Sequence, residues 1–251
     1  MTSCKKLVQY HPAEVRPNVR DLNAHSIARL EKIPQSDTFS FAVISDLQRF
    51  YDELDDFVDY ENNVQEFAFI LVAGDISDFG LNKEYNLIAD ILQKLKSPFI
   101  TVIGNHDMLG NGKLIYRQMF GNENFTFTFG NNKFILFNSN GREVGFNGQL
   151  PDMGWLTSEV ANSDEYTNLF FVSHVPPFSG DFDPSMEDRY VTLMNTTANA
   201  RLSLHGHEHR FYMGFHYADN FPYLITPEIH EKSFSRVKVE GSIISVTQEF
   251  F

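Results

Sequence analysis

The sequence is short of cysteine, of basic residues and of long apolar runs. Its 251 residues include one cysteine, Cys4, which excludes an intrachain disulfide and a cysteine-built zinc site. Lysine and arginine total 20 against 33 aspartates and glutamates, a formal net charge of −13. This balance argues against a generic nucleic-acid-binding surface, which is normally basic. No apolar run reaches the roughly 20 residues that a membrane-spanning helix needs.

What the chain does contain is enough apolar and aromatic material for a substantial core. Phenylalanine alone accounts for 25 residues, and the length suits one large domain or two small ones. Residues 1–37 show no strand pattern and are interrupted by Pro12, Pro17 and Pro34. We therefore predict an N-terminal tail over 1–37, with a short helix at 23–32, and a single domain over 38–251.

Residues 39–103 alternate between buried apolar runs and helical spacing. The pattern predicts strands at 39–44, 67–73 and 99–103, and helices at 51–66 and 81–95. Strands that alternate with helices indicate parallel crossovers and hence an α/β fold.

The second half of the chain is richer in strands. We expect a hairpin over 125–137, a helix at 152–160, short strands at 169–172, 202–204, 211–217 and 223–226, and an antiparallel pair at 236–246. The acidic stretch 181–188 is read as a solvated loop. Segments 108–122 and 141–154 are read as loops that shape substrate access.

Polar residues follow five of these strands at the point where each ends. They are Asp46, Gly74-Asp75, Gly104-Asn105-His106-Asp107, His174 and Gly206-His207-Glu208-His209. Singly, such residues are ordinary turn formers or structural histidines. As an ordered set at the carboxyl ends of strands, they predict one shared site. Carboxylates, an amide and imidazoles are ligands of transition metals, and a pair of metals is the usual device for hydrolysing phosphate esters.

With these blocks in place, residues 39–210 resemble the calcineurin-like metallophosphoesterase family. The resemblance implies a four-layer αββα sandwich, in which two mixed β-sheets are flanked by helices. It also implies a centre of two divalent ions, with Mn²⁺ favoured and iron, Zn²⁺ or Mg²⁺ as alternatives. A hydroxide that bridges the two ions would attack the phosphorus of a phosphate monoester or diester.

The resemblance also implies a role for each residue of the blocks. Asp75 would bridge both metals. The first metal would add Asp46 and His209, and the second would add Asn105, His174 and His207. His106 would face the scissile phosphate and stabilise its charge or protonate the leaving oxygen, with Asp107 orienting the His106 ring.

Gln48 departs from the family pattern, which has histidine at this position. An amide oxygen is a neutral and weaker donor than imidazole, so either Gln48 ligates weakly or water replaces it. Both alternatives predict a more labile first metal. The departure also leaves room for a catalytically weak or inactive scaffold that binds metals or partners. The retained His106, His174, His207 and His209 favour the enzyme.

The N-terminus carries a second, shorter resemblance. Cys4 to Pro12 is similar to the mature ends of envelope lipoproteins of Gram-negative bacteria. We therefore expect a lipid anchor on Cys4 and a location in the cell envelope; if Cys4 is an ordinary thiol, the location is cytoplasmic. The substrate is expected to be a phosphorylated small molecule or lipid.

Overall fold

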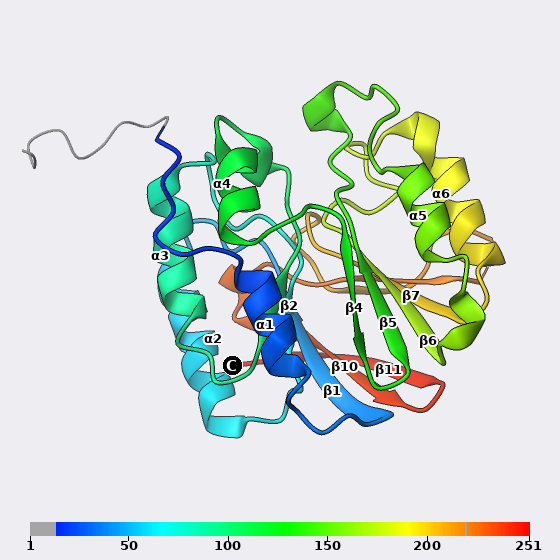
Figure 1. Ribbon diagram of the computed structural model, residues 1–251, viewed down its shortest axis with the longest axis horizontal. Helices are drawn as coiled ribbons and strands as arrows, with labels where there is room; N and C mark the ends of the chain where they lie inside the picture. The colour runs from blue at the N-terminus through cyan, green and yellow to red at the C-terminus, as the bar shows by residue number, and fades with distance from the viewer. Residues whose placement is uncertain (1–13, 219) are drawn as a thin grey trace, which may run out of the picture.

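The computed structural model describes residues 14–218 and 220–251 (Figure 1). The predictions for Cys4 therefore lie outside the described residues. No helix in the described part of the chain combines the length and apolar character needed to cross a bilayer.

The first sheet contains five strands in the order β11-β10-β1-β2-β3. Their bounds are β1 Thr38–Ile44, β2 Ile70–Val72, β3 Phe99–Thr101, β10 Ser233–Glu240 and β11 Ile243–Phe250. β1, β2 and β3 are parallel, and β10 and β11 form an antiparallel extension beside β1. The predicted parallel crossovers and the C-terminal antiparallel pair are both confirmed.

The second sheet contains six strands in the order β4-β5-β6-β7-β9-β8. Their bounds are β4 Phe125–Phe129, β5 Asn132–Leu136, β6 Asn168–Val172, β7 Ala200–His205, β8 Tyr212–Phe215 and β9 Pro222–Ile225. β5, β6, β7 and β9 are parallel, whereas β4 and β8 are antiparallel edge strands. Both sheets are therefore mixed.

The space between the sheets is filled largely by phenyl rings. Phe41 and Phe69 of the first sheet stack at 5.0 Å between centroids, and Phe134 and Phe170 of the second stack at 4.8 Å. Phe41 meets Phe134 edge-on at 5.5 Å. Such offset and edge contacts are the favoured ring geometries, and they join the sheets into one dry core.

Helices cover the outer faces of both sheets (Figure 1). α2 Tyr51–Val64, α3 Asn82–Leu92 and α4 Gly112–Met119 pack on the first sheet, and α5 Met153–Glu159 and α6 Pro184–Thr196 pack on the second. The predicted four-layer αββα sandwich is confirmed.

The structure corrects the predicted boundary of the domain. α1 Leu22–Leu30 lies beside β3, with Leu22 and Leu30 buried in the core. The Asn23 side chain also exchanges hydrogen bonds with the backbone of Thr101, at 2.9 and 3.0 Å. Residues 22–30 therefore belong to the domain, and the predicted boundary at residue 38 is too late.

Two segments read as loops contain helices. α4 lies within 108–122, and α6 begins in the acidic stretch 181–188. Asp183 caps α6 by accepting from the Ser185 amide at 3.0 Å, and Pro184 occupies its first turn. The acidic residues that suggested a solvated loop are favourable in the first turn of a helix.

α2 is tied to the start of β3 by a buried carboxyl group. Ser97 Oγ donates to Glu61 Oε1 at 2.6 Å, whereas Glu61 Oε2 is buried without a hydrogen-bond partner. Burial raises the pKa of Glu61 above its ordinary value of 4.5, against the opposing effect of Ser97. The carboxyl group of Glu61 therefore holds its proton more tightly in the folded protein than in the unfolded chain.

This linkage predicts how stability depends on pH. The contribution of the Glu61 carboxyl group to the free energy of unfolding is complete at pH values below the pKa that this group has in the unfolded chain. The contribution is lost as the pH rises through the higher pKa of the folded protein. Glu61→Gln has no such loss, so at neutral pH it should gain about 1 kcal/mol over wild type, in line with the cost of a buried unsatisfied group. Urea unfolding at pH 4 and pH 7 measures this. Asp59→Asn, an exposed change on the same helix, should show no pH-dependent gain; a constant difference for Glu61→Gln would contradict the assignment.

Candidate metal centre

The five polar blocks converge where the two sheets meet. Asp46, Asp75 and Asn105 follow β1, β2 and β3 of the first sheet, whereas the three histidines His174, His207 and His209 follow β6 and β7 of the second. Asp46 joins the two groups, because its Oδ2 accepts from the backbone amide of His207 at 3.2 Å. The ligand set thus spans the seam between the sheets.

The buried heart of the site consists of Asp46, Asp75 and His174. One ligand atom of each lies within 4.8 Å of the others. His174 Nδ1 donates to the carbonyl of Ala73 at 2.7 Å. Its Nε2 therefore points the other way, 3.2 Å from Asp75 Oδ2 and 3.0 Å from Asn105 Oδ1. A backbone carbonyl that fixes one nitrogen and aims the other is typical support for a metal-binding imidazole.

His207 and His209 complete the ring of donors. His207 Nδ1 lies 3.1 Å from Asn105 Oδ1, and His209 Nε2 lies 3.1 Å from Asp46 Oδ1. The opposite nitrogens meet carboxylates that sequence reasoning missed: Asp181 is 3.4 Å from His207, and Glu228 is 3.4 Å from His209. Both come from loops without a motif, so the sequence carried no signal for them.

The donor set fits divalent cations. Carboxylate and amide oxygens crowd together: Gln48 Oε1 is buried without a hydrogen-bond partner, and the closest ion pair of Asp46 Oδ1 among the described residues is the one with His209. Burial should lower the pKa of His174, yet the charges of Asp75 and Asp46 raise it to about 9. The site therefore demands positive charge at its centre, which a metal ion supplies more fully than a proton.

Gln48 lies inside this site rather than at its edge. Its Nε2 donates to Asp75 Oδ2 at 3.4 Å, and its side chain is buried with the ligands. That Gln48 coordinates a metal stays a prediction. The residue does occupy the place from which its unsatisfied oxygen could serve as a donor.

His106 stands beside the buried ligands and is partly open to solvent, with 35% of its side chain exposed. Its backbone amide donates to Asp75 Oδ1 at 3.0 Å, and its Nδ1 donates to the carbonyl of Asp78 at 2.8 Å. Asp78 also binds Arg49, at 2.6 Å. The residue that orients the His106 ring is thus Asp78, which sequence reasoning missed.

The prediction that Asp107 orients the His106 ring is therefore wrong. The buried Asp107 carboxylate instead accepts hydrogen bonds from the amides of Ile76, Ser77 and Gly104 and from Ser77 Oγ, at 2.8–3.1 Å. Burial and the nearby charge of Asp75 raise its pKa to about 6, against these bonds. Asp107 fastens the loop after β2 to the loop after β3.

Four of the predicted ligand residues have left-handed backbone conformations. The φ angles are 56° for Asp46, 53° for Asp75, 70° for His207 and 53° for His209. Such conformations are uncommon outside glycine, cost free energy and cluster at functional sites. The unusual conformations occur in the loops after strands of both sheets, at residues whose side chains converge on the same site.

Comparison with known proteins identifies the family. Residues 39–211 match the family described as calcineurin-like phosphoesterase. The chain belongs to this family. A stretch of 49 residues of the phosphoesterase is 37% identical to a protein of Xenorhabdus bovienii named "Probable cyclic nucleotide phosphodiesterase". That alignment covers 20% of each chain.

Solved structures share the fold at low sequence identity. A dimetal phosphatase from Danio rerio is 13% identical, with a TM-score of 0.67 over 84% of this chain and 98% of that one. A purple acid phosphatase from Lupinus luteus is 10% identical, with a TM-score of 0.68 over 86% of this chain and 52% of that one. GAP50, described as the anchor in the inner membrane complex of Plasmodium, is 14% identical, with a TM-score of 0.64 over 84% of each chain.

The phosphoesterase also needs a glycine inside the site. A Cβ placed on Gly104 would overlap both the carboxylate and the backbone amide of Asp75. A side chain at this position would therefore push the loop after β3 away from the loop after β2.

This close approach predicts the effect of Gly104→Ala. Overpacking typically costs about 1–3 kcal/mol, and here the displacement falls on Asp75. We expect a lower melting temperature and reduced metal binding, measured by calorimetry and by metal analysis after dialysis against Mn²⁺. The matched control is Gly180→Ala, where a Cβ meets no atom within 4 Å. Gly104→Ala with wild-type metal content would show that the loops can separate without harm.

Proposed function

We propose that the phosphoesterase hydrolyses phosphate esters with two divalent metal ions held by the buried donor set. Membership of the calcineurin-like phosphoesterase family supports the broader activity, the hydrolysis of phosphoesters. The observation that carries the proposal is the contact of Asp75, Asn105 and His174 across the seam between the sheets, with an unsatisfied amide oxygen beside them. We propose Mn²⁺ as the native ion because oxygen donors dominate around Asp46 and Gln48.

The arrangement of donors supports an assignment for each ion. Asp75 lies between the two groups of ligands and would serve both ions. Asp46, Gln48 and His209 would hold the first ion, and Asn105, His174 and His207 the second. Bound there, divalent ions supply a water-derived nucleophile and neutralise charge that develops on the phosphoryl group.

His106 is the side chain that we assign to the substrate. Its Nδ1 proton is committed to the Asp78 carbonyl, so Nε2 is the atom available to hold a proton or a hydrogen bond for the ester. The partial exposure of the ring supports this role, because a substrate can reach it. Nε2 would protonate the leaving oxygen or stabilise the phosphoryl charge.

A non-catalytic scaffold is the second candidate. Gln48 supports it, because a neutral donor replaces imidazole at the first ion. The similarity to GAP50 also shows that a protein described as an anchor can carry this fold. Turnover of bis(p-nitrophenyl) phosphate or p-nitrophenyl phosphate with added Mn²⁺ separates the two candidates. If neither ester is hydrolysed, the result favours the non-catalytic scaffold.

Substitution of Asp75 and Asn105 tests the assignment of the ions. Asp75→Asn should weaken both metals together and abolish most turnover, because the bridging carboxylate serves both. Asn105→Ala should weaken mainly the second metal. Metal analysis at graded Mn²⁺ concentrations, together with the diesterase assay, measures these effects. Wild-type metal content in Asp75→Asn would refute the bridging role.

Substitution of His106 tests its role at the leaving group. His106→Ala should retain its metals and lose turnover by about 10²–10⁴-fold for a poor leaving group such as an alkyl phosphate. The loss should be smaller for a p-nitrophenyl ester, whose leaving oxygen needs little protonation. Equal losses with both leaving groups would assign His106 to charge stabilisation instead.

A further inference from the structure

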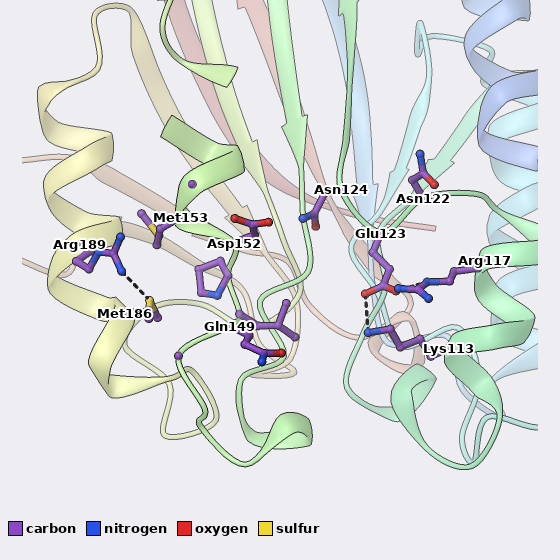
Figure 2. A pocket seen from close by; sticks show the side chains of 14 residues that line it. Lys113, Arg117, Asn122, Glu123, Asn124, Gln149, Asp152, Met153, Met186 and Arg189 are labelled. Carbon is purple, nitrogen blue, oxygen red and sulfur yellow. Dashed lines mark hydrogen bonds and ion pairs between the residues drawn. The ribbon is translucent and has the colours of Figure 1, made fainter. Parts of the chain in front are cut away.

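A polar cleft lies beside α4, and none of the metal-binding donors lines it (Figure 2). Its volume is about 850 Å³, within the range of ligand sites. Its ionisable lining consists of Lys113, Arg117, Arg189, Glu123 and Asp152. Three basic groups against two acidic ones make the cleft locally positive in a chain whose net charge is −13.

Both carboxylates of the cleft are already engaged. Glu123 binds Lys113 Nζ at 3.1 Å and Arg117 Nε at 2.6 Å, and only 9% of its side chain is exposed. Asp152 caps α5 by accepting from the amide of Trp155 at 3.0 Å. Glu123 thus holds two cations at the cleft wall, with one negative charge between them.

The opposite wall carries a cation without a counter-ion. The contact found for the Arg189 guanidinium is Met186 Sδ at 3.6 Å, and no carboxylate in the described residues lies within ion-pair distance of it. Figure 2 shows Arg189 across the cleft from Lys113 and Arg117. Cations on two walls suit an anion placed between them, and the guanidinium fork matches the oxygens of a phosphate.

Hydrogen bonds connect both walls to the metal-binding loops. On one side, Asn138 Nδ2 donates to Glu123 at 2.7 Å, and Asn140 bridges Asn138 and the carbonyl of Ile103, the residue before Gly104. On the other side, the Gly148 amide donates at 2.8 Å to Asp183, two residues after the Asp181 that contacts His207. Both walls of the cleft are therefore tied by hydrogen bonds to the loops that carry the metal-binding donors.

We propose that this cleft binds a phosphate group of the substrate other than the one that is cleaved. The inference rests on the proposed function, and it narrows the substrate class to phosphoesters that carry a second phosphate. Lys113, Arg117 and Arg189 bind the second phosphate, while the scissile phosphate lies at the metal-binding donors.

Two substrates with the same leaving group test the proposal. They are thymidine 5′-(p-nitrophenyl phosphate) and its 3′-phosphorylated derivative. Wild type should favour the 3′-phosphorylated compound in kcat/KM by about tenfold or more, the effect of one charge-assisted hydrogen bond. Arg189→Gln and Lys113→Gln should each remove most of this preference. Lys238→Gln, an exposed charge change on β10, should retain it.

A binding measurement separates failure of this inference from failure of the proposed function. Trp155 is the single tryptophan of the chain and adjoins the cleft through Asp152, so its fluorescence can report occupancy without turnover. Wild type should bind thymidine 3′,5′-bisphosphate about tenfold more tightly than thymidine 5′-monophosphate, and Arg189→Gln should not. Equal binding of the two nucleotides by wild type, or an unchanged preference in Arg189→Gln, would overturn the cleft assignment whether or not the esters are hydrolysed.

Discussion

The structure depends on the burial of two carboxylates, Asp46 and Asp75, whose oxygens lie within 4.8 Å of each other and of a His174 nitrogen. Asp46 and Asp75 are almost fully shielded from water, and bringing two like charges into such a place is unfavourable without compensating positive charge. The residues around the two carboxylates supply this positive charge. Imidazoles approach from the second sheet, and the pKa of His174 is raised to about 9. A divalent ion resolves the same imbalance more completely, which is why the geometry favours a metal centre.

A rigid scaffold is needed to keep the buried carboxylates and the imidazoles close together. The phenyl core between the sheets provides it, because Phe41, Phe69, Phe134 and Phe170 interlock across the seam. The Asp107 carboxylate then fastens two of the ligand loops together through backbone amides. Left-handed conformations at Asp46, Asp75, His207 and His209 persist because this frame determines them.

Much of this arrangement could be predicted from the sequence, and the failures have physical causes. The strands were predicted correctly because they are buried apolar runs, and the polar residues that end these runs do converge on one site. α6 was missed because its charged and polar residues weaken its apolar periodicity, and α4 was missed because its apolar pattern extends over only 8 residues. The contacts of Asp78, Asp181 and Glu228 with the histidines depend on how distant loops meet, which local sequence does not encode. The role of Asp107 was misassigned because its side chain accepts hydrogen bonds from backbone amides of the loops and not from the adjacent His106.

The division of the ligands between two sheets has a consequence for the core. Carboxylates and the amide stand on one sheet and imidazoles on the other, so the gap between the two groups depends on the separation of the sheets, to which the layer of rings contributes. The fit of an ion held by both groups would therefore depend on the volume of these rings. Substitution of a core phenylalanine far from the site would change the gap between the two groups of donors, and a metal ion of another radius would require a different gap. Packing in the hydrophobic core would in this way influence which ion radius fits the site.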